Sequence, residues 1–340
     1  MKKKTIQRLL ITISSIVILL IAFFIYSAIL LNERITVDGT INIIIPKDAS
    51  IEKTINIFNQ NGLLKPSWFF KLFAKTYAKL YNNVIHTGCY RFDSKNRNIH
   101  LIKAILTGEN QLIIKVTYPE GITLKDFASI TQRKLGVDSA EFIGIALSDS
   151  LIKARKIPAK TIEGYLMPET YEFFWKETAI NVIDRLLNQQ NKIWNQKFAQ
   201  KADSIGKTRH EILTLASIVE AESPVNDEKA RIAGVYYNRL SRNWKLQADP
   251  TVQYALGLKK KLTLSDLEYV SPYNTYLNYG LPPTPINSPS IKSIEAVLNP
   301  EKHNYFFFVA SGISDARHYF ASTGSQHLKN KQLFKQTRKK

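Results

Sequence analysis

TRHEILTLASIVEAES, residues 208–223, is the stretch that decides the fold of the larger part of this chain. Thr208 is followed three residues later by Glu211, a spacing that forms a capping box and predicts the start of a helix. Nearly every later position is apolar, and a helix that is apolar on all sides is buried in a core. We therefore predict a central helix here, with Glu220 as a carboxylate near its C-terminal end.

Glu220 is the first candidate for chemistry, because its neighbours one turn back are small or apolar. Desolvation raises the pKa of a carboxyl, and the negative end of the helix dipole acts in the same direction. A glutamate that stays protonated near neutral pH can act as general acid on a glycosidic bond. An ion pair with an arginine such as Arg231 or Arg239 is the structural alternative. Glu222 competes for the same catalytic role.

The composition limits the partners and the cofactors. The chain carries 47 Lys and Arg against 28 Asp and Glu, a net charge of +19, which indicates an anionic neighbour. No nucleic-acid motif is present, and the basic C-terminal end is expected to be solvated. The one cysteine, Cys89, excludes an intrachain disulfide and a cysteine-ligated zinc site, and we expect it to be a buried bystander. The histidine spacing suggests no metal site and no cofactor.

Residues 9–31 form an apolar run without a charge, longer than the about 20 residues that a membrane span needs. Lys2, Lys3, Lys4 and Arg8 precede it, so the positive-inside rule places residues 1–8 in the cytoplasm. The run exceeds the roughly 7–15 apolar residues of a signal peptide, which favours an uncleaved single-pass anchor in the cytoplasmic membrane. The linker 32–39 reaches no more than about 30 Å, so the next domain is expected to stay near the bilayer.

The exported part is predicted to be α+β in two domains. Strands interleaved with helices suggest a small α+β unit over residues 40–118. Its predicted strands are 40–46, 88–92 and 111–118, and its predicted helices are 49–61, 66–81 and 98–106, the last one stopped by Gly108. Residues 119–340 form a second, mixed α+β domain. It opens with a helical stretch to about residue 160 and a longer helix over 181–202.

Polar and proline-containing loops follow the helix of Glu220. They are rich in Asn, Gln, Thr and Tyr, whose donors and acceptors suit sugar hydroxyls and N-acetyl groups. Turn chemistry explains any single loop equally well. The segments are YNRL (237–240), LQADPT (246–251), SPYNTY (271–276) and GLPPTPI (280–286).

Together these motifs resemble the endolytic murein transglycosylases, also called the YceG-like family. The matching pieces, in chain order, are TYPEG (117–121), EGYLMPETY (163–171), LASIVEAES (215–223), YYNRL (236–240), LQADPTVQYALG (246–257), SPYNTY (271–276), GLPPTPI (280–286) and RHYF (317–320). The resemblance covers most of residues 40–330, and the N-terminal span fits it. Ala221 departs from the usual Lys of the family, and Thr284 from a common Gly that would leave the groove wider.

The resemblance implies that Glu220 is the catalytic glutamate and that the small unit is a LysM-like glycan-binding module. Glu220 would protonate the oxygen that leaves C1 of N-acetylmuramic acid (MurNAc). It would then take the proton of that sugar's 6-hydroxyl, which closes a 1,6-anhydro ring without water. Peptidoglycan glycan strands near the membrane are the implied substrate, and wall synthases or divisome or elongasome proteins the implied partners. The predicted glycan contacts are Gln247, Asp249, Thr251, Tyr273, Asn274, Tyr276, Asn238 and Glu163.

Three alternatives remain open at this point. A non-catalytic wall-binding scaffold would keep the fold without cleaving glycan. A hydrolytic muramidase would use Asp249 or Glu222 as a second carboxylate and leave reducing ends. A basic membrane-surface binder that acts through charge alone would lose its binding steeply with salt.

Overall fold

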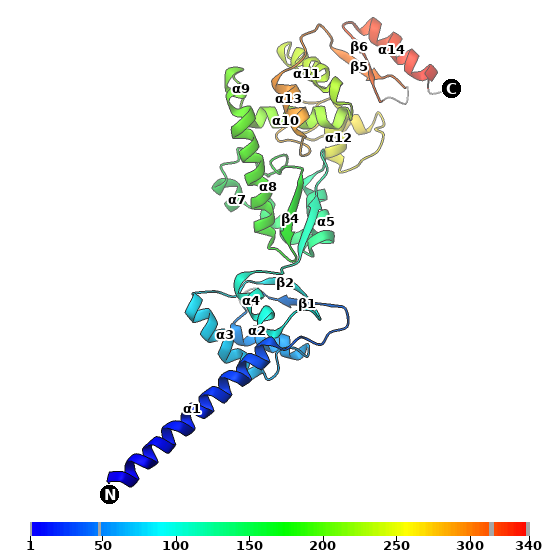
Figure 1. Ribbon diagram of the computed structural model, residues 1–340. Helices are drawn as coiled ribbons and strands as arrows, with labels where there is room; N and C mark the ends of the chain where they lie inside the picture. The colour runs from blue at the N-terminus through cyan, green and yellow to red at the C-terminus, as the bar shows by residue number, and fades with distance from the viewer. Residues whose placement is uncertain (1, 47–48, 313–315, 338–340) are drawn as a thin grey trace. The chain divides into compact units, whose positions relative to one another are not determined.

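The computed structural model describes residues 2–46, 49–312 and 316–337 (Figure 1). The chain divides into two compact units, each made of two segments: Met1–Ile114 with Phe174–Lys176, and Lys115–Phe173 with Glu177–Lys340. Both units contain helices and short paired strands, so the predicted α+β class is confirmed. The first segment of the first unit ends after Ile114, whereas the sequence placed the domain boundary after residue 118.

Helix α1, Lys2–Asn32, contains the predicted span 9–31. Its segment Ile6–Asn32 is apolar and long enough to cross a membrane, with a mean hydropathy of 2.8, and its most apolar window is 0% buried. A membrane anchor and a signal sequence both have such an N-terminal apolar helix. The structure therefore confirms the apolar helix.

Five of the six elements predicted for residues 40–118 lie in the first unit, whereas the strand predicted at 111–118 forms at Ile113–Thr117, mostly in the second unit. Strands β1, Thr40–Ile45, and β2, Gly88–Asp93, pair antiparallel, with Ile43 opposite Tyr90. The helices are α2, Ile51–Gln60, α3, Ser67–Tyr81, and α4, Asn98–Thr107. Gly108 ends α4 in the left-handed conformation, at φ 79°, which a residue without a Cβ adopts at low cost. Cys89 is buried in β2, as expected.

The start of the second unit contains more breaks than the sequence suggested. β3, Ile113–Thr117, forms a two-stranded sheet with β4, Thr170–Phe174, a strand that was not predicted. The single predicted helical stretch to residue 160 is three helices, because Gly136 ends the first and Asp138 and Ser148 cap the next two. These are α5, Leu124–Leu135, α6, Ser139–Ala146, and α7, Asp149–Ala154. The predicted helix 181–202 is α8, Ala179–Ile193, a π-helical turn, Trp194–Phe198, and α9, Ala199–Ser204.

The central helix of this unit is α10, Arg209–Glu222, and it begins as predicted with the Thr208–Glu211 capping box. All eight residues from Ile212 to Val219 are buried, which confirms that the helix is apolar on every side because it is enclosed. The helices α11, Asn226–Ser241, α12, Asp249–Leu256, and α13, Ile291–Leu298, surround it.

The C-terminal part is more ordered than expected. β5, Phe307–Ala310, pairs antiparallel with β6, His318–Ala321. The predicted solvated tail is a helix in its described part, α14, Gly324–Thr337, which packs on β5 and β6. Thr337 ties the helix end to the Ser311 carbonyl, at 3.1 Å. The basic residues 338–340 lie outside the described residues.

Candidate active site

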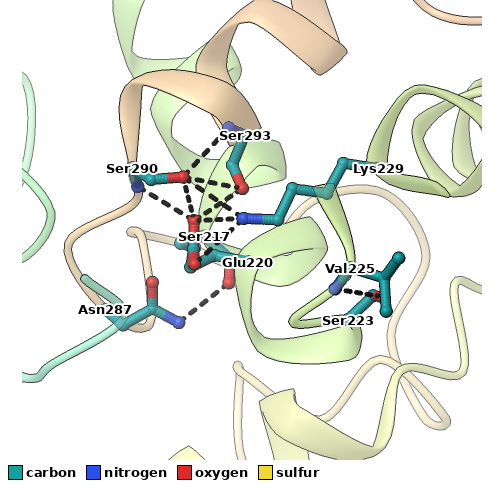
Figure 2. A network of polar contacts seen from close by, with 8 residues as sticks. All are labelled: Ser217, Glu220, Ser223, Val225, Lys229, Asn287, Ser290 and Ser293. Atoms are coloured by element: carbon teal, nitrogen blue, oxygen red, sulfur yellow. Dashed lines mark hydrogen bonds and ion pairs between the residues drawn. The ribbon is translucent and has the colours of Figure 1, made fainter. Parts of the chain in front are cut away.

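Glu220 lies in the last turn of α10, and its carboxylate faces the N-terminus of α13 (Figure 2). Its Oε2 atom accepts the Ser290 backbone N–H at 2.9 Å and the Ser290 hydroxyl at 2.5 Å. The Ser293 hydroxyl donates to the same oxygen at 2.6 Å. Ser290 is also the N-cap of α13, so one residue both starts that helix and binds the glutamate. The N-terminus of α13 therefore binds the carboxylate of Glu220.

Lys229 of α11 supplies the charge opposite Glu220. Its Nζ lies 3.1 Å from each carboxylate oxygen and 3.3 Å from the Ser290 hydroxyl. The side chains are 2% exposed for Lys229 and 10% for Glu220, so the pair is shielded from bulk water. An ion pair formed in these surroundings is much stronger than one on the surface, and each charge depends on the other.

The ion-pair alternative was right in kind and wrong in residue. Arg231 pairs instead with Glu301, at 3.0 Å. Arg239 is buried and donates to the Phe306 and Leu246 carbonyls. Lys229 follows Glu220 on the next helix, and only the packing of α11 against α10 and α13 brings it to the carboxylate.

The expectation that Glu220 has a raised pKa is wrong. Burial does act in that direction, but the bonds from Ser290 and Ser293 and the charge of Lys229 outweigh it and lower the pKa of Glu220. The dipole of α10 is not the only helix dipole that acts on Glu220. In the fold, the carboxylate also meets the positive N-terminal end of α13, whose donors come from residues 70 or more positions away in sequence. Glu220 is therefore ionised at neutral pH.

A tight turn of the TYPEG motif lies against the glutamate. Gly121 has φ +71°, and a Cβ at this position would be 3.4 Å from Cγ of Glu220. The Gly121 N–H donates to the Ser288 carbonyl and the Ser288 N–H to the Ile122 carbonyl, both at 2.9 Å. These hydrogen bonds thus hold the turn against the loop that precedes Ser290.

A cavity of about 820 Å³ adjoins this turn. It is lined by Gly121, Ala221, Asn287, Tyr254 and Glu163, with lysines Lys125 and Lys259–Lys261 also in its wall. The volume falls in the range of about 300–1,000 Å³ that is typical of ligand sites. The mixture of amide, hydroxyl, carboxyl and ammonium groups suits a polar ligand.

Glu163, a predicted glycan contact, is buried at the wall of the cavity. It accepts the Leu124 N–H at 2.9 Å and the Tyr254 hydroxyl at 3.3 Å. Burial raises the pKa of Glu163 to about 8, so this carboxyl is protonated at neutral pH.

Four of the predicted contacts lie on the loop surface near α12. Gln247 and Asp249 are exposed, and the Tyr276 hydroxyl donates to Asp249 at 2.6 Å. Tyr273 is half-buried and shares a hydrogen bond of 2.7 Å with Thr284, the residue that replaces the common glycine. These side chains keep polar surface that a ligand can reach.

Two predicted contacts need correction, and a third, Asn238, stays a prediction. Thr251 and Asn274 are 0% exposed, which leaves a glycan no access to them. Thr251 bonds the Ala248 carbonyl at 2.7 Å, and Asn274 donates to the Leu267 and Tyr269 carbonyls at 2.9 and 2.8 Å. The half-buried Asn238 uses its amide on the carbonyls of residues 303 and 305. Short polar side chains satisfy loop backbone in this way, and the local pattern is the same as for a ligand contact.

Glu222 lies two residues beyond Glu220 and therefore leaves the helix on another side. It accepts the Tyr236 hydroxyl at 2.6 Å. Burial raises the pKa of Glu222 to about 7, with a contribution from the charge of Asp249. Among the residues that the structure describes, no group of three or more His, Cys, Asp or Glu is placed to hold a metal ion.

Lys229, Ser290 and Ser293 are the site residues that sequence reasoning missed. The spacing of Ser290 and Ser293 before the apolar IEAVL run is an N-cap signal, and it could have located the start of α13. No local pattern links that helix start to a glutamate 70 residues earlier, or Lys229 to a glutamate nine residues earlier on the preceding helix.

The fold and the site together define a class of protein. The model of the YceG-like family matches residues 43–333, and the chain belongs to this family. The resemblance drawn from the motifs is confirmed.

Named relatives and a solved structure agree with this assignment. An endolytic murein transglycosylase of Bacillus subtilis (strain 168) is 30% identical over 313 residues, 87% of this chain and 85% of that protein. One of Streptococcus pneumoniae (strain D39) is 29% identical over 317 residues, but the match spans only 57% of its length. A crystal structure of a yceG-like protein from Listeria monocytogenes has a TM-score of 0.60 and 31% identity, covering 86% of this chain and 99% of that one.

Proposed function

We propose that this protein is a membrane-anchored lytic transglycosylase that cleaves peptidoglycan strands between MurNAc and N-acetylglucosamine (GlcNAc), with Glu220 at the reacting bond. The observation that carries the proposal is a shielded, ionised glutamate whose neighbour Ala221 lines a cavity of about 820 Å³ with both polar and apolar walls, in a chain of this family. The names of the relatives support peptidoglycan as the substrate.

The state of Glu220 supports the base half of the reaction. An ionised carboxylate can take the proton of the MurNAc 6-hydroxyl, whose oxygen then bonds to C1 and closes the 1,6-anhydro ring. Oε2 is engaged by Ser290 and Ser293, whereas Oε1 has a hydrogen bond only from Lys229 among the described residues. Oε1 is therefore the oxygen with room for a substrate hydroxyl.

The anchor and the first unit would place the enzyme where strands are made. With Lys2–Lys4 and Arg8 in the cytoplasm, α1 would hold the catalytic unit on the outer face of the membrane. A LysM-like role for the first unit is supported by a cavity of about 450 Å³ with mostly polar walls, including Arg91, Asp93, Asn96 and Gln111. Cutting nascent strands near the bilayer would terminate their elongation, beside the synthases that extend them.

The test is a digest of purified peptidoglycan by the full chain in detergent, followed by mass spectrometry of the fragments. The wild type should release muropeptides lighter by one water, and Glu220→Gln should release none. Glu268→Gln, which changes an exposed glutamate of the same unit, is the matched control and should behave as wild type. Reducing-end products would mean a hydrolase, and no cleavage by the wild type would mean a binding scaffold.

A further inference from the structure

Helix α3 of the first unit exposes large apolar side chains for which the proposed reaction has no use. Trp68 is 58% exposed, Leu72 55% and Leu80 74%. Residues 68 and 72 are one helical turn apart and therefore lie on the same face of α3. The opposite face is buried in the unit and consists of Phe69, Phe70, Ala74 and Ala78. Adjacent exposed apolar side chains on a surface helix indicate a binding partner.

The surface of α3 continues from the apolar helix α1. The Tyr26 ring of α1 packs edge-on against the Phe69 ring of α3, with 6.5 Å between the ring centroids. From Phe69 a row of rings follows α3 in steps of four residues, through Phe73 and Tyr77 to Tyr81, with centroids 6.3, 6.0 and 4.5 Å apart. Figure 1 shows α3 beginning beside α1 and running off to one side of it. The two helices therefore share one aromatic surface.

Hydrogen bonds fix the joint between α1 and the first unit. Asn98 of α4 donates its side-chain amide to the Leu30 carbonyl at 2.9 Å and its backbone N–H to the Glu33 carbonyl at 3.0 Å. Arg97 donates to the side chain of Asn32 at 3.0 Å. The Leu30 side chain itself belongs to the hydrophobic core of the first unit. A bilayer that holds α1 would therefore always meet the same side of this unit.

The length of α1 gives the height of α3 relative to such a bilayer. The apolar run begins at Leu9, directly after Arg8, and Tyr26 follows 17 residues later, a rise of about 26 Å along the helix. The hydrocarbon core of a bilayer is about 30 Å thick. With Leu9 at the inner boundary, Tyr26 lies about 4 Å below the outer boundary. Phe69, which packs on Tyr26, is therefore at the level where hydrocarbon meets the lipid headgroups.

The charge of α3 suits the same location. The helix contains Lys71, Lys75 and Lys79 and no acidic residue. Lys75 pairs with Glu52 at 2.5 Å, whereas Lys71 and Lys79 form no ion pair with the residues that the structure describes. Helices that lie in a membrane surface combine Trp, Phe and Leu with lysines in this way, and anionic lipid attracts the lysines. A second copy of the chain would instead bring like charges to the same face.

We propose that the face of α3 with Trp68, Leu72 and Leu80 lies in the outer headgroup boundary of the bilayer, as a second membrane contact beside α1. This inference rests on the proposed anchoring by α1. The ligand is a bilayer surface that contains anionic lipid. A single span leaves the first unit free to tilt, and the contact of α3 fixes the tilt. The first unit then meets glycan at a set height and orientation above the membrane.

The experiment measures the depth of single labelled positions of the full chain in phospholipid vesicles. A nitrobenzoxadiazole fluorophore is attached, in a Cys89→Ala background, to Ser15→Cys in α1, Leu72→Cys in α3 or Leu264→Cys in the second unit. Leu264 is 84% exposed and is the matched control. With a nitroxide quencher near the lipid headgroups, the Leu72 label should lose about half of its emission and the Leu264 label about a tenth or less. A quencher near the end of the acyl chains should act most strongly on the Ser15 label.

A second readout tests the lysines of α3. Raising phosphatidylglycerol from none to about a third of the lipid should increase the quenching of the Leu72 label. Lys71→Gln combined with Lys79→Gln should remove this increase. Lys331→Gln combined with Lys335→Gln makes the same change of charge in α14 and should leave the increase intact. An unchanged lipid dependence in the α3 variant would overturn the proposed charge contact.

The three labels separate this inference from the anchoring on which it rests. A quenched Ser15 label, together with a Leu72 label quenched no more than the Leu264 label, would overturn the inference and leave the anchor in place. A blue-shifted Leu72 label that the lipid quencher does not reach would mean that protein, such as a second copy, covers the face, and would also overturn it. An unquenched Ser15 label would overturn the proposed anchoring and the inference with it.

Discussion

Replacing Glu220 by Gln should cost stability as well as activity, because it leaves the Lys229 ammonium buried without its counter-charge. Lys229 is 2% exposed and its remaining partner is the Ser290 hydroxyl at 3.3 Å. Breaking one side of a buried pair costs about 3–5 kcal/mol. We expect a loss of about 3 kcal/mol, near the lower limit, since the Ser290 contact persists and glutamine offers one carbonyl oxygen. Against a total of about 5–15 kcal/mol the variant should still fold.

A double-mutant cycle with Lys229→Met isolates the pair. Lys229→Met alone leaves the carboxylate with three donors from Ser290 and Ser293, so its cost should be smaller, about 2 kcal/mol. The double variant removes both charges and should be more stable than Glu220→Gln alone, with a coupling of about 2 kcal/mol or more. Urea unfolding of the full chain in detergent, followed by tryptophan fluorescence, measures all four proteins. Additive costs within about 0.5 kcal/mol would refute the claim that the two residues share one buried interaction.

The remaining predictions concern pH and the loops. The folded pKa of Glu163 is raised from 4.5 to about 8, so protonation favours the fold below pH 4.5 and this advantage is lost as pH rises through 8. One pKa unit corresponds to about 1.4 kcal/mol, so Glu163→Gln should raise the free energy of unfolding by up to about 5 kcal/mol at pH 9 and by little at pH 5. An equal effect of the substitution at both pH values would contradict the claim that burial raises the pKa of Glu163. Gly121→Ala should lower the free energy of unfolding by about 1 kcal/mol, because φ +71° disfavours a Cβ, and should leave kcat largely unchanged, because the added Cβ would lie at an ordinary contact distance of 3.4 Å from Cγ of Glu220. A large loss of kcat would show that the strained turn moves and displaces Glu220. Thr251→Ala should lower the free energy of unfolding by about 1 kcal/mol and leave the KM for peptidoglycan unchanged, because Thr251 is buried. Gln247→Ala should raise this KM without a change in stability. A raised KM for Thr251→Ala with an unchanged KM for Gln247→Ala would mean that Thr251 contacts the glycan.

Elements with their own start and stop signals could be predicted from the sequence. The Thr208–Glu211 capping box located α10, and Gly108 located the end of α4. β4, in contrast, is five residues long and is defined by its pairing with β3, so no local signal separates it from a loop. The sequence of α14 is basic and has no apolar stripe, so it predicts a solvated end. Its packing on β5 and β6 becomes evident only in the structure.

In the candidate site, too, local features could be predicted from the sequence and tertiary contacts could not. Glu220 could be found because its motif is local, and its neighbours in sequence then suggested a protonated acid. The structure reverses that state through Ser290, Ser293 and Lys229, which reach the carboxylate only by tertiary packing. The prediction of Thr251 and Asn274 as glycan contacts was wrong for a related reason. A polar residue that hydrogen-bonds to buried backbone groups has the same local sequence pattern as one that faces a ligand.

The origin of the oxygen at the cut end tests the central claim most directly. Peptidoglycan would be digested by the full chain in water enriched in the heavy oxygen isotope, and the new ends reduced at once with borohydride and weighed. We predict ends that carry no heavy oxygen and resist reduction, because the 6-hydroxyl of MurNAc closes on C1 in place of water. One heavy oxygen at each new reducible end would contradict the account and identify the enzyme as a hydrolase.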